Sequence, residues 1–290
     1  MRCLVFGATG LIGSHLIPLI SKEYTVLTVG VHKNNTYQID LGKEWKADLF
    51  PERIDNIIYL AQSLKFRDFP NAAEEIFWVN NLSLLKALDY ARRARARSFI
   101  YTSSGGVYEK SNEVYEENAP LNPQGSLGFY IGTKMCGEII ANNYTPFMNI
   151  VVLRPFIVYG PGQRKEMLIP RLVERVNNGL PIHLVGKEGV KINPTFVEDA
   201  AQAVKQAMEL KESRTINVGG PEILSMRQIG EQIGQALGKS ALFEEKEGSE
   251  EIMAGCIQLM SEKLWTPLIN FSKGIKLYVD SLKSSSGTYV

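Results

Sequence analysis

The chain has 290 residues, of which 44% are hydrophobic, so it can bury a large core as one α/β domain or as two unequal ones. Its 32 basic and 31 acidic residues give a net charge of +1, which excludes an overall field that would recruit nucleic acid or an anionic membrane. A small molecule is therefore the expected partner.

The first half of the chain alternates short apolar runs with helical patterns, which is typical of a parallel sheet covered on both faces. Strands are predicted at 3–6, 25–29, 56–60, 98–103 and 150–153. Helices are predicted at 11–22, 72–93 and 130–143. The pattern indicates an α/β fold with a doubly wound parallel sheet.

After Arg154-Pro155 the pattern changes to that of a smaller, mixed α/β region. Its predicted elements are a loop at 159–162, helices at 167–178, 196–210 and 225–237, and strands at 181–185 and 215–218. We therefore expect a first domain at 1–158 and a second region at 159–290. The helix near 196–210 is expected to pack back on the first domain, and 284–290 to form a flexible tail.

Cysteine and histidine offer no metal site. The three cysteines are odd in number and lack C-x-x-C spacing, and the three histidines lack ligand spacing, so we expect a metal-free protein in a reducing compartment. Glycines interrupt the apolar amino terminus, and no run approaches the ~20 apolar residues of a membrane span. A cytoplasmic location is predicted.

A glycine-rich loop follows the first predicted strand directly and opens a helix. Gly7 permits a tight turn, Gly10 lets the backbone approach a pyrophosphate, and Gly13 permits close helix packing. The helix N-terminus adds N–H donors and a positive dipole. The first domain is therefore expected to bind a dinucleotide. The expected contacts in this loop are Gly7, Thr9, Gly10, Leu11, Ile12 and Gly13.

The end of the second predicted strand lacks the carboxylate that usually accepts from the ribose 2′-hydroxyl of NAD. Gly30 stands there, followed by Val31, His32 and Lys33. No carboxylate would repel a 2′-phosphate and Lys33 can pair with one, so NADP is expected in preference to NAD, with His32 and Lys33 as contacts. A solvated loop is the other interpretation of these two residues.

Tyr130 and Lys134 are four residues apart, so both side chains leave the same face of a predicted helix. A phenol normally titrates near ~10, and a neighbouring ammonium group favours the phenolate, which gives an acid/base closer to neutrality. The same spacing also occurs by chance on exposed helices. Other motifs in the chain are needed to distinguish a catalytic pair from a chance spacing.

Several motifs occur in a fixed order along the chain. They are the glycine loop, Tyr101-Thr-Ser-Ser104-Gly-Gly-Val-Tyr108, Tyr130-x-x-x-Lys134, Leu153-Arg-Pro-Phe-Ile-Val-Tyr-Gly-Pro161, Asn193-Pro-Thr-Phe-Val-Glu-Asp199 and Ile216-Asn-Val-Gly-Gly220. The ordered set resembles the extended short-chain dehydrogenase/reductases, specifically the NAD-dependent epimerase/dehydratase group that acts on nucleotide sugars. The resemblance extends to about residue 240 and implies a Rossmann fold.

The resemblance implies a role for each catalytic residue. Ser104 would hydrogen-bond the substrate oxygen, Tyr130 would transfer the proton, and Lys134 would hold the cofactor ribose and favour the phenolate. Hydride would pass between the nicotinamide and the same sugar carbon. The other cofactor contacts that the resemblance implies are Asp48 and Leu49 at the adenine, the strand-end segment Leu60, Ala61 and Gln62, together with Thr102 and Pro155.

Departures from the family pattern narrow the expected chemistry. Sugar 4,6-dehydratases place an Asp-Glu pair directly after the position of Ser104, where this chain has Gly105 and Gly106, so dehydration is disfavoured. Other members have Asn and Arg where this chain has Ile157 and Ile192. Arg164, Arg171 and Lys191 are candidates to replace the lost charge, with a surface role as the alternative. The expected substrate contacts are Ser104, Gly105, Gly106, Ile157, Arg164 and Lys191.

These observations predict an enzyme that transfers hydride at a hydroxyl or carbonyl carbon of a nucleotide-linked hexose. A 4-ketoreductase that uses NADPH is favoured by Gly30 and Lys33, and an NAD-dependent 4-epimerase is the alternative. A non-catalytic NADP(H)-binding regulator and a reductase of a non-sugar carbonyl are further hypotheses. The resemblance also implies a homodimer built from the predicted helices 72–93 and 130–143.

Overall fold

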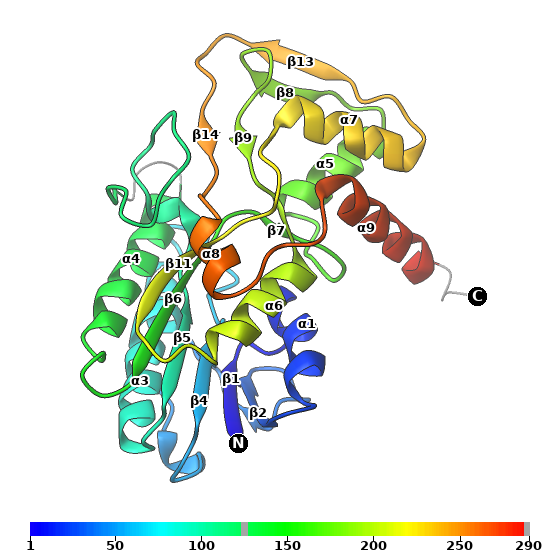
Figure 1. Ribbon diagram of the computed structural model, residues 1–290. Coiled ribbons are helices and arrows are strands. Elements are labelled where there is room, and N and C mark those ends of the chain that lie inside the picture. Colours follow the sequence, from blue (N-terminus) through cyan, green and yellow to red (C-terminus); the bar gives the residue numbers. More distant parts are fainter. Residues whose placement is uncertain (123–126, 287–290) are drawn as a thin grey trace. The chain divides into compact units, whose positions relative to one another are not determined.

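The protein is described by a computed structural model that covers residues 1–122 and 127–286 (Figure 1). The chain divides into two compact units. Unit 1 comprises Met1–Glu109, Asn118–Pro155 and Ala201–Ile216, and unit 2 comprises Lys110–Glu117, Phe156–Ala200 and Asn217–Val290. Each unit has its own buried apolar core.

A seven-stranded sheet forms the frame of unit 1. Its strand order is β11-β6-β5-β4-β1-β2-β3, and the pairings from β3 through β6 are parallel. The strands are β1 (Arg2–Phe6), β2 (Thr25–Gly30), β3 (Tyr37–Gln38), β4 (Asn56–Tyr59), β5 (Ser98–Thr102), β6 (Asn149–Pro155) and β11 (Arg214–Val218). The central strands β4 and β5 are buried at every residue because both faces of the sheet are covered. The predicted doubly wound parallel sheet is confirmed.

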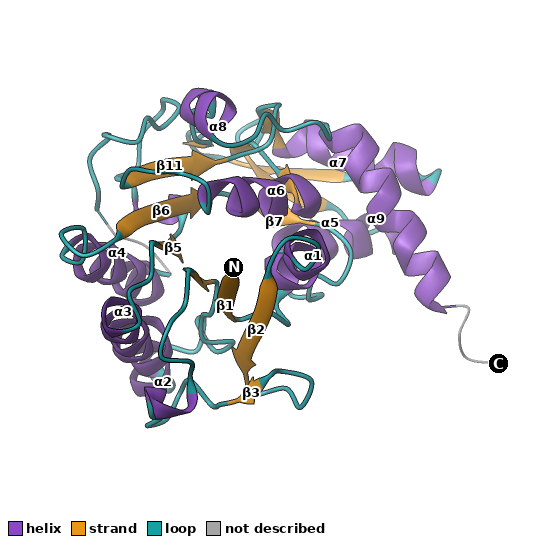
Figure 2. Cartoon of the chain, turned by 60° about the horizontal axis from the view of Figure 1, so that its bottom comes forward, coloured by secondary structure: helices purple, strands orange, loops and turns teal. Residues whose placement is uncertain are grey.

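Helices cover both faces of this sheet. Helices α3 and α4 lie side by side on one face and α1 lies on the other (Figures 1 and 2). The predicted helix 72–93 consists of α2, a π-helical turn and α3. The helical segments are α1 (Leu11–Ile20), η1 (Ala47–Leu49), α2 (Ala73–Phe77), η2 (Trp78–Leu82), α3 (Ser83–Arg93), η3 (Gly105–Val107), α4 (Gly128–Asn142) and α6 (Val197–Ala207).

Unit 2 has three small sheets and four helices within the described residues. Strands β7 (Val158–Tyr159) and β10 (Thr195–Phe196) form one sheet, β8 (Ile182–Val185) and β13 (Phe243–Lys246) form another, and β12 (Leu224–Ser225), β9 (Lys191–Ile192) and β14 (Ile252–Met253) form the third. The helices are α5 (Leu168–Asn177), α7 (Met226–Leu237), α8 (Gln258–Lys263) and α9 (Phe271–Ser286).

The ends of α7 follow from its sequence. Ser225 caps the helix by accepting from the backbone N–H of Gln228, whose side chain in turn accepts from the Ser225 backbone N–H. Gly238 ends the helix at φ 66°, a conformation that glycine adopts without strain. The tail predicted at 284–290 begins inside α9, and residues 287–290 lie outside the part of the chain that the structure describes.

The described residues contain neither a membrane-spanning helix nor a cluster of metal ligands. In the ranges 1–122 and 127–286, no helix is long and apolar enough to cross a bilayer. Over the same ranges, no three histidine, cysteine or acidic side chains are grouped so that they could hold a metal ion.

Candidate active site

The three predicted catalytic residues meet at the carboxyl end of β5. Ser104 follows this strand and enters η3, while Tyr130 and Lys134 lie in consecutive turns of α4. Tyr130 is 9% exposed and Lys134 is 1% exposed. The Ser104 hydroxyl is hydrogen-bonded to the Tyr130 phenol, and its oxygen accepts from the Gly106 backbone N–H at 3.1 Å. The Gly106 contact leaves the hydroxyl proton of Ser104 free to donate to Tyr130.

The environment of Tyr130 favours its protonated form. Burial raises the pKa of the phenol well above its ordinary value, and the hydrogen bond from Ser104 lowers this pKa by a smaller amount. The Tyr130 Oη donates to Gln62 Oε1 at 2.9 Å. In the ligand-free protein the phenol is therefore protonated, and its proton is directed toward Gln62.

Lys134 is a buried amine beside this phenol. Burial lowers its pKa to about 7, and the negative charge of Glu138 acts in the opposite direction. Its Nζ donates to the Thr102 carbonyl oxygen at 2.9 Å and lies 5.9 Å from the centroid of the Tyr130 ring. The side chain can therefore exchange a proton near neutral pH.

A buried ion pair supports Lys134, and sequence reasoning missed it. The Glu138 carboxylate accepts from Arg154 Nε at 3.0 Å and Nη2 at 2.6 Å, and it also accepts from the Ser103 hydroxyl. Arg154 Nη1 donates to Tyr108 Oη at 2.8 Å. Breaking such a buried pair typically costs about 3–5 kcal/mol. The network joins α4 to the ends of β5 and β6. Its one indication in the sequence is an acidic residue, Glu138, placed four residues after Lys134 on the same helix.

The glycine loop has the geometry that a pyrophosphate requires. Gly7 has φ 83°, and a Cβ there would lie 2.8 Å from the Ala61 backbone nitrogen. A Cβ on Gly13 would lie 2.5 Å from the Gly7 carbonyl oxygen. Gly10 precedes α1, and no side chain of the described residues caps this helix. The backbone N–H groups of Leu11 and Ile12 lie in the first turn, close to Thr9. They are thus available to phosphate oxygens.

Thr102, whose carbonyl oxygen accepts from Lys134, also contributes a polar side chain. Its hydroxyl is buried and has no hydrogen-bond partner among the described residues. Leu60 and Ala61 follow β4 at the same edge of the sheet, and Pro155 ends β6. The glycine loop, the unpaired hydroxyl and these strand ends together fit a dinucleotide.

Strand β2 ends in Gly30, where an NAD-binding strand usually has an Asp or Glu at its end. A Cβ on Gly30 would lie 3.1 Å from Asn35 Nδ2, so the carboxamide of Asn35 fills the space beside the glycine. This amide donates to the His32 carbonyl oxygen at 2.8 Å. His32 and Lys33 are both exposed on the loop. The contacts of His32 and Lys33 with a cofactor stay a prediction.

A cavity of about 620 Å³ opens beside the ends of β2, β3 and β4 in unit 1. Asp40, Leu41 and Gln62 are among its lining residues. Asp48 and Leu49 do not line it, and they lie exposed in η1. Asp40 and Leu41 closely follow β3, whose two residues are too few for periodicity to reveal, so the sequence did not indicate them as lining residues.

The predicted substrate contacts fall into two groups. Gly105 and Gly106 lie beside Ser104 in unit 1, and a Cβ on Gly106 would lie 2.6 Å from Ile131 Cδ1, so a larger residue would require this side chain to move. Ile157 is half-buried in unit 2. Arg164 Nε lies 3.4 Å from Glu166 Oε2, and Lys191 Nζ lies 3.9 Å from Glu250 Oε2.

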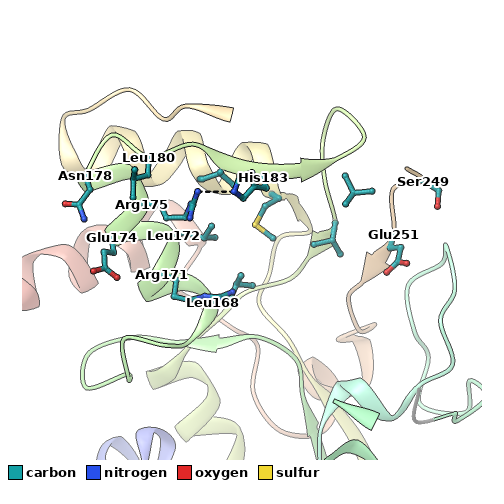
Figure 3. Close-up of a pocket in the computed structure, with 14 residues that line it drawn as sticks. Leu168, Arg171, Leu172, Glu174, Arg175, Asn178, Leu180, His183, Ser249 and Glu251 are labelled. Carbon is teal, nitrogen blue, oxygen red and sulfur yellow. Dashed lines mark hydrogen bonds between the residues drawn. The ribbon is translucent and has the colours of Figure 1, made fainter. Parts of the chain in front are cut away.

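Unit 2 has a cavity of its own, of about 640 Å³ (Figure 3). Helix α5 contributes Arg171 and Arg175 to its lining, and strand β8 contributes His183. Arg175 Nη2 and His183 Nε2 are 3.2 Å apart; Arg175 Nε also donates to the Pro181 carbonyl oxygen, and His183 Nδ1 lies 3.0 Å from Glu244 Oε2. Of these residues the sequence had indicated only Arg171. The apolar side chains of this lining are Leu168, Leu172, Leu180, Ile182, Val185, Val190 and Met226.

The chain matches a model of the NAD dependent epimerase/dehydratase family over residues 3–219. It belongs to this family. The predicted membership is confirmed, and the protein is an enzyme of the extended short-chain dehydrogenase/reductase type. Its relatives include both nucleotide-sugar epimerases and nucleotide-sugar reductases.

Two relatives represent these two activities. The UDP-glucuronate 4-epimerase of Thermodesulfobacterium geofontis is 25% identical and covers 86% of this chain and 79% of its own. The GDP-6-deoxy-D-mannose reductase of Pseudomonas aeruginosa is 29% identical and covers 68% of this chain and 66% of its own. The structure of UDP-glucuronic acid 4-epimerase from Bacillus cereus in complex with UDP-glucuronic acid and NAD is 25% identical, with a TM-score of 0.85 over 98% of this chain and 100% of that one.

Proposed function

We propose that the protein is an NAD-dependent 4-epimerase of a UDP-linked hexose. The observation that carries the proposal is the convergence of Ser104, Tyr130 and Lys134 in a buried site at the end of β5. The Bacillus cereus 4-epimerase, whose structure contains NAD, covers nearly the whole chain and supports this choice of reaction.

Each side chain of the site has a distinct task in this reaction. Bound NAD supplies the chemistry of hydride acceptance and return. Tyr130 takes the proton of the sugar hydroxyl and later gives it back, while Ser104 hydrogen-bonds the same oxygen. Lys134 lowers the cost of forming the phenolate when it is charged. Gly105 and Gly106 supply no carboxylate pair, so water elimination is not part of the proposal.

We assign the cofactor to unit 1. The N–H groups at the start of α1 would bind the pyrophosphate. Asp40 and Leu41, rather than the expected Asp48 and Leu49, would contact the adenosine half, because only the former pair lines the cavity. The cavity of unit 2 would take the nucleotide of the substrate, with Arg171 and Arg175 near phosphate and with apolar walls for the base.

A 4-ketoreductase that uses NADPH is the second candidate. It is favoured by Gly30, which leaves no carboxylate at the end of β2, and by the exposed amine of Lys33. Both candidates use the same three catalytic residues. They differ in hydride balance: the epimerase would take a hydride from the sugar and return it, whereas the reductase would transfer one hydride to the sugar and release oxidised cofactor.

We also propose that two copies associate through α3 and α4, as the family resemblance implies. Leu85 on α3 and Ile139 on α4 are 41% and 58% exposed, and Phe147, which follows α4, is 60% exposed. Covering such side chains with a second copy would remove apolar surface from water.

The purified protein should be incubated with NAD and each of UDP-glucose, UDP-glucuronic acid and UDP-N-acetylglucosamine, and the products identified by NMR spectroscopy. One of these sugars should be converted to its 4-epimer without net change in cofactor oxidation. Stoichiometric oxidation of NADPH with a 4-keto sugar nucleotide, and no epimer, would favour the reductase instead.

A further inference from the structure

Gln62 lies between the catalytic phenol and the cavity of unit 1. It follows β4 closely, its side chain is half-buried, and it lines the cavity. Its Oε1 accepts the hydrogen bond of Tyr130 Oη at 2.9 Å. The family resemblance had placed Gln62 only among the cofactor contacts. The geometry puts it in direct contact with the atom that transfers the proton.

The two polar partners of Tyr130 act on its proton in opposite directions. Ser104 donates to the phenol oxygen, which favours the phenolate and lowers the pKa. Gln62 accepts the hydrogen bond of the phenol O–H, which favours the neutral phenol. Phe66 packs against the phenol ring with centroids 5.0 Å apart, so the ring is held between these partners.

We propose that Gln62 is a further catalytic residue, which sets the proton affinity of Tyr130 through its carboxamide oxygen. It keeps the phenol in the acid form that can give its proton to a carbonyl oxygen. Together with burial, it thereby raises the pH above which the phenolate that hydroxyl oxidation requires is populated. The inference rests on the proposed function, in which Tyr130 transfers the proton.

Reduction and oxidation of the sugar carbon require opposite protonation states of Tyr130. In reduction, hydride leaves the reduced nicotinamide and bonds to the carbonyl carbon, while the Tyr130 proton passes to the carbonyl oxygen and leaves a phenolate. In oxidation both transfers run backward, and Tyr130 must first be a phenolate. Loss of the Gln62 hydrogen bond should therefore let oxidation begin at lower pH.

Two substitutions of similar size test this role with opposite expected signs. Gln62→Met removes the acceptor and should lower the pKa of Tyr130 by up to about one unit, roughly tenfold in proton affinity. The acidic limb of kcat/KM for hydroxyl oxidation then moves to lower pH. Gln62→Glu places a carboxylate beside the phenol and should move that limb to higher pH. Loss of packing alone would not produce shifts of opposite sign.

The phenolate can also be measured without any sugar. Ultraviolet difference absorbance of the NAD-bound protein, taken against the same variant that also carries Tyr130→Phe, reports the pKa of this phenol alone. This readout stands even if the proposed sugar reaction is wrong. Ser63→Ala is the matched control, since Ser63 lines the same cavity but donates to Glu75. Unshifted pKa values in both Gln62 variants, or shifts of the same sign, would overturn the proposal.

Discussion

Burial of the Lys134 amine lowers the stability of the folded protein and gives the amine a pKa suited to proton exchange. Its pKa is about 7 in the folded protein and near ~10.4 when unfolded, so between these values the unfolded state binds more protons and stability rises with pH. Below about pH 7 the full cost of the buried charge is present. Lys134→Met should therefore raise the free energy of unfolding by roughly 2–4 kcal/mol at about pH 6, with the lost hydrogen bond to the Thr102 carbonyl already subtracted. This gain should fade toward pH 10. Urea denaturation of the ligand-free protein at several pH values measures this, and a gain that did not depend on pH would contradict it.

At the scale of elements, α3 and α4 carry both the support of the site and the proposed subunit contact. Lys134 and Glu138 lie on the buried side of α4, while Ile139 is exposed. Ile139→Lys should weaken self-association at least about tenfold, because it places a charge where apolar surface would be covered. Sedimentation equilibrium measures the association, and Leu268→Lys, which alters an exposed leucine of unit 2, is the control. Equal association of both variants and the wild type would exclude this face.

For the whole molecule, the sequence predicted what depends on local pattern and order. The alternation of apolar runs with helical periods gave the doubly wound sheet, and the glycine loop was meaningful because a strand precedes it and a helix follows. The ordered motifs predicted the family. They also predicted the meeting of Ser104 with Tyr130, which rests on two segments that are separate in the chain.

Contacts that only tertiary packing creates could not be predicted in this way. The two-residue strand β3 gives no periodic signal, so the position of Asp40 in the cavity lining was not predicted, while the contact of Asp48 with the cofactor stays a prediction. Arg154 donates a hydrogen bond to Glu138, and Tyr130 donates one to Gln62. Each bond joins residues that are far apart in the chain or on different elements. No spacing rule specifies which side chain reaches a given phenol.

The central claim is that Tyr130 transfers the proton in a reaction at a sugar carbon. The most direct measurement is the turnover of wild type and Tyr130→Phe with the sugar nucleotide that the wild type converts, alongside cofactor binding by calorimetry. We expect Tyr130→Phe to lose at least about a hundredfold in kcat while its Kd for the cofactor changes less than about threefold. Wild-type turnover in the Tyr130→Phe protein would contradict the account.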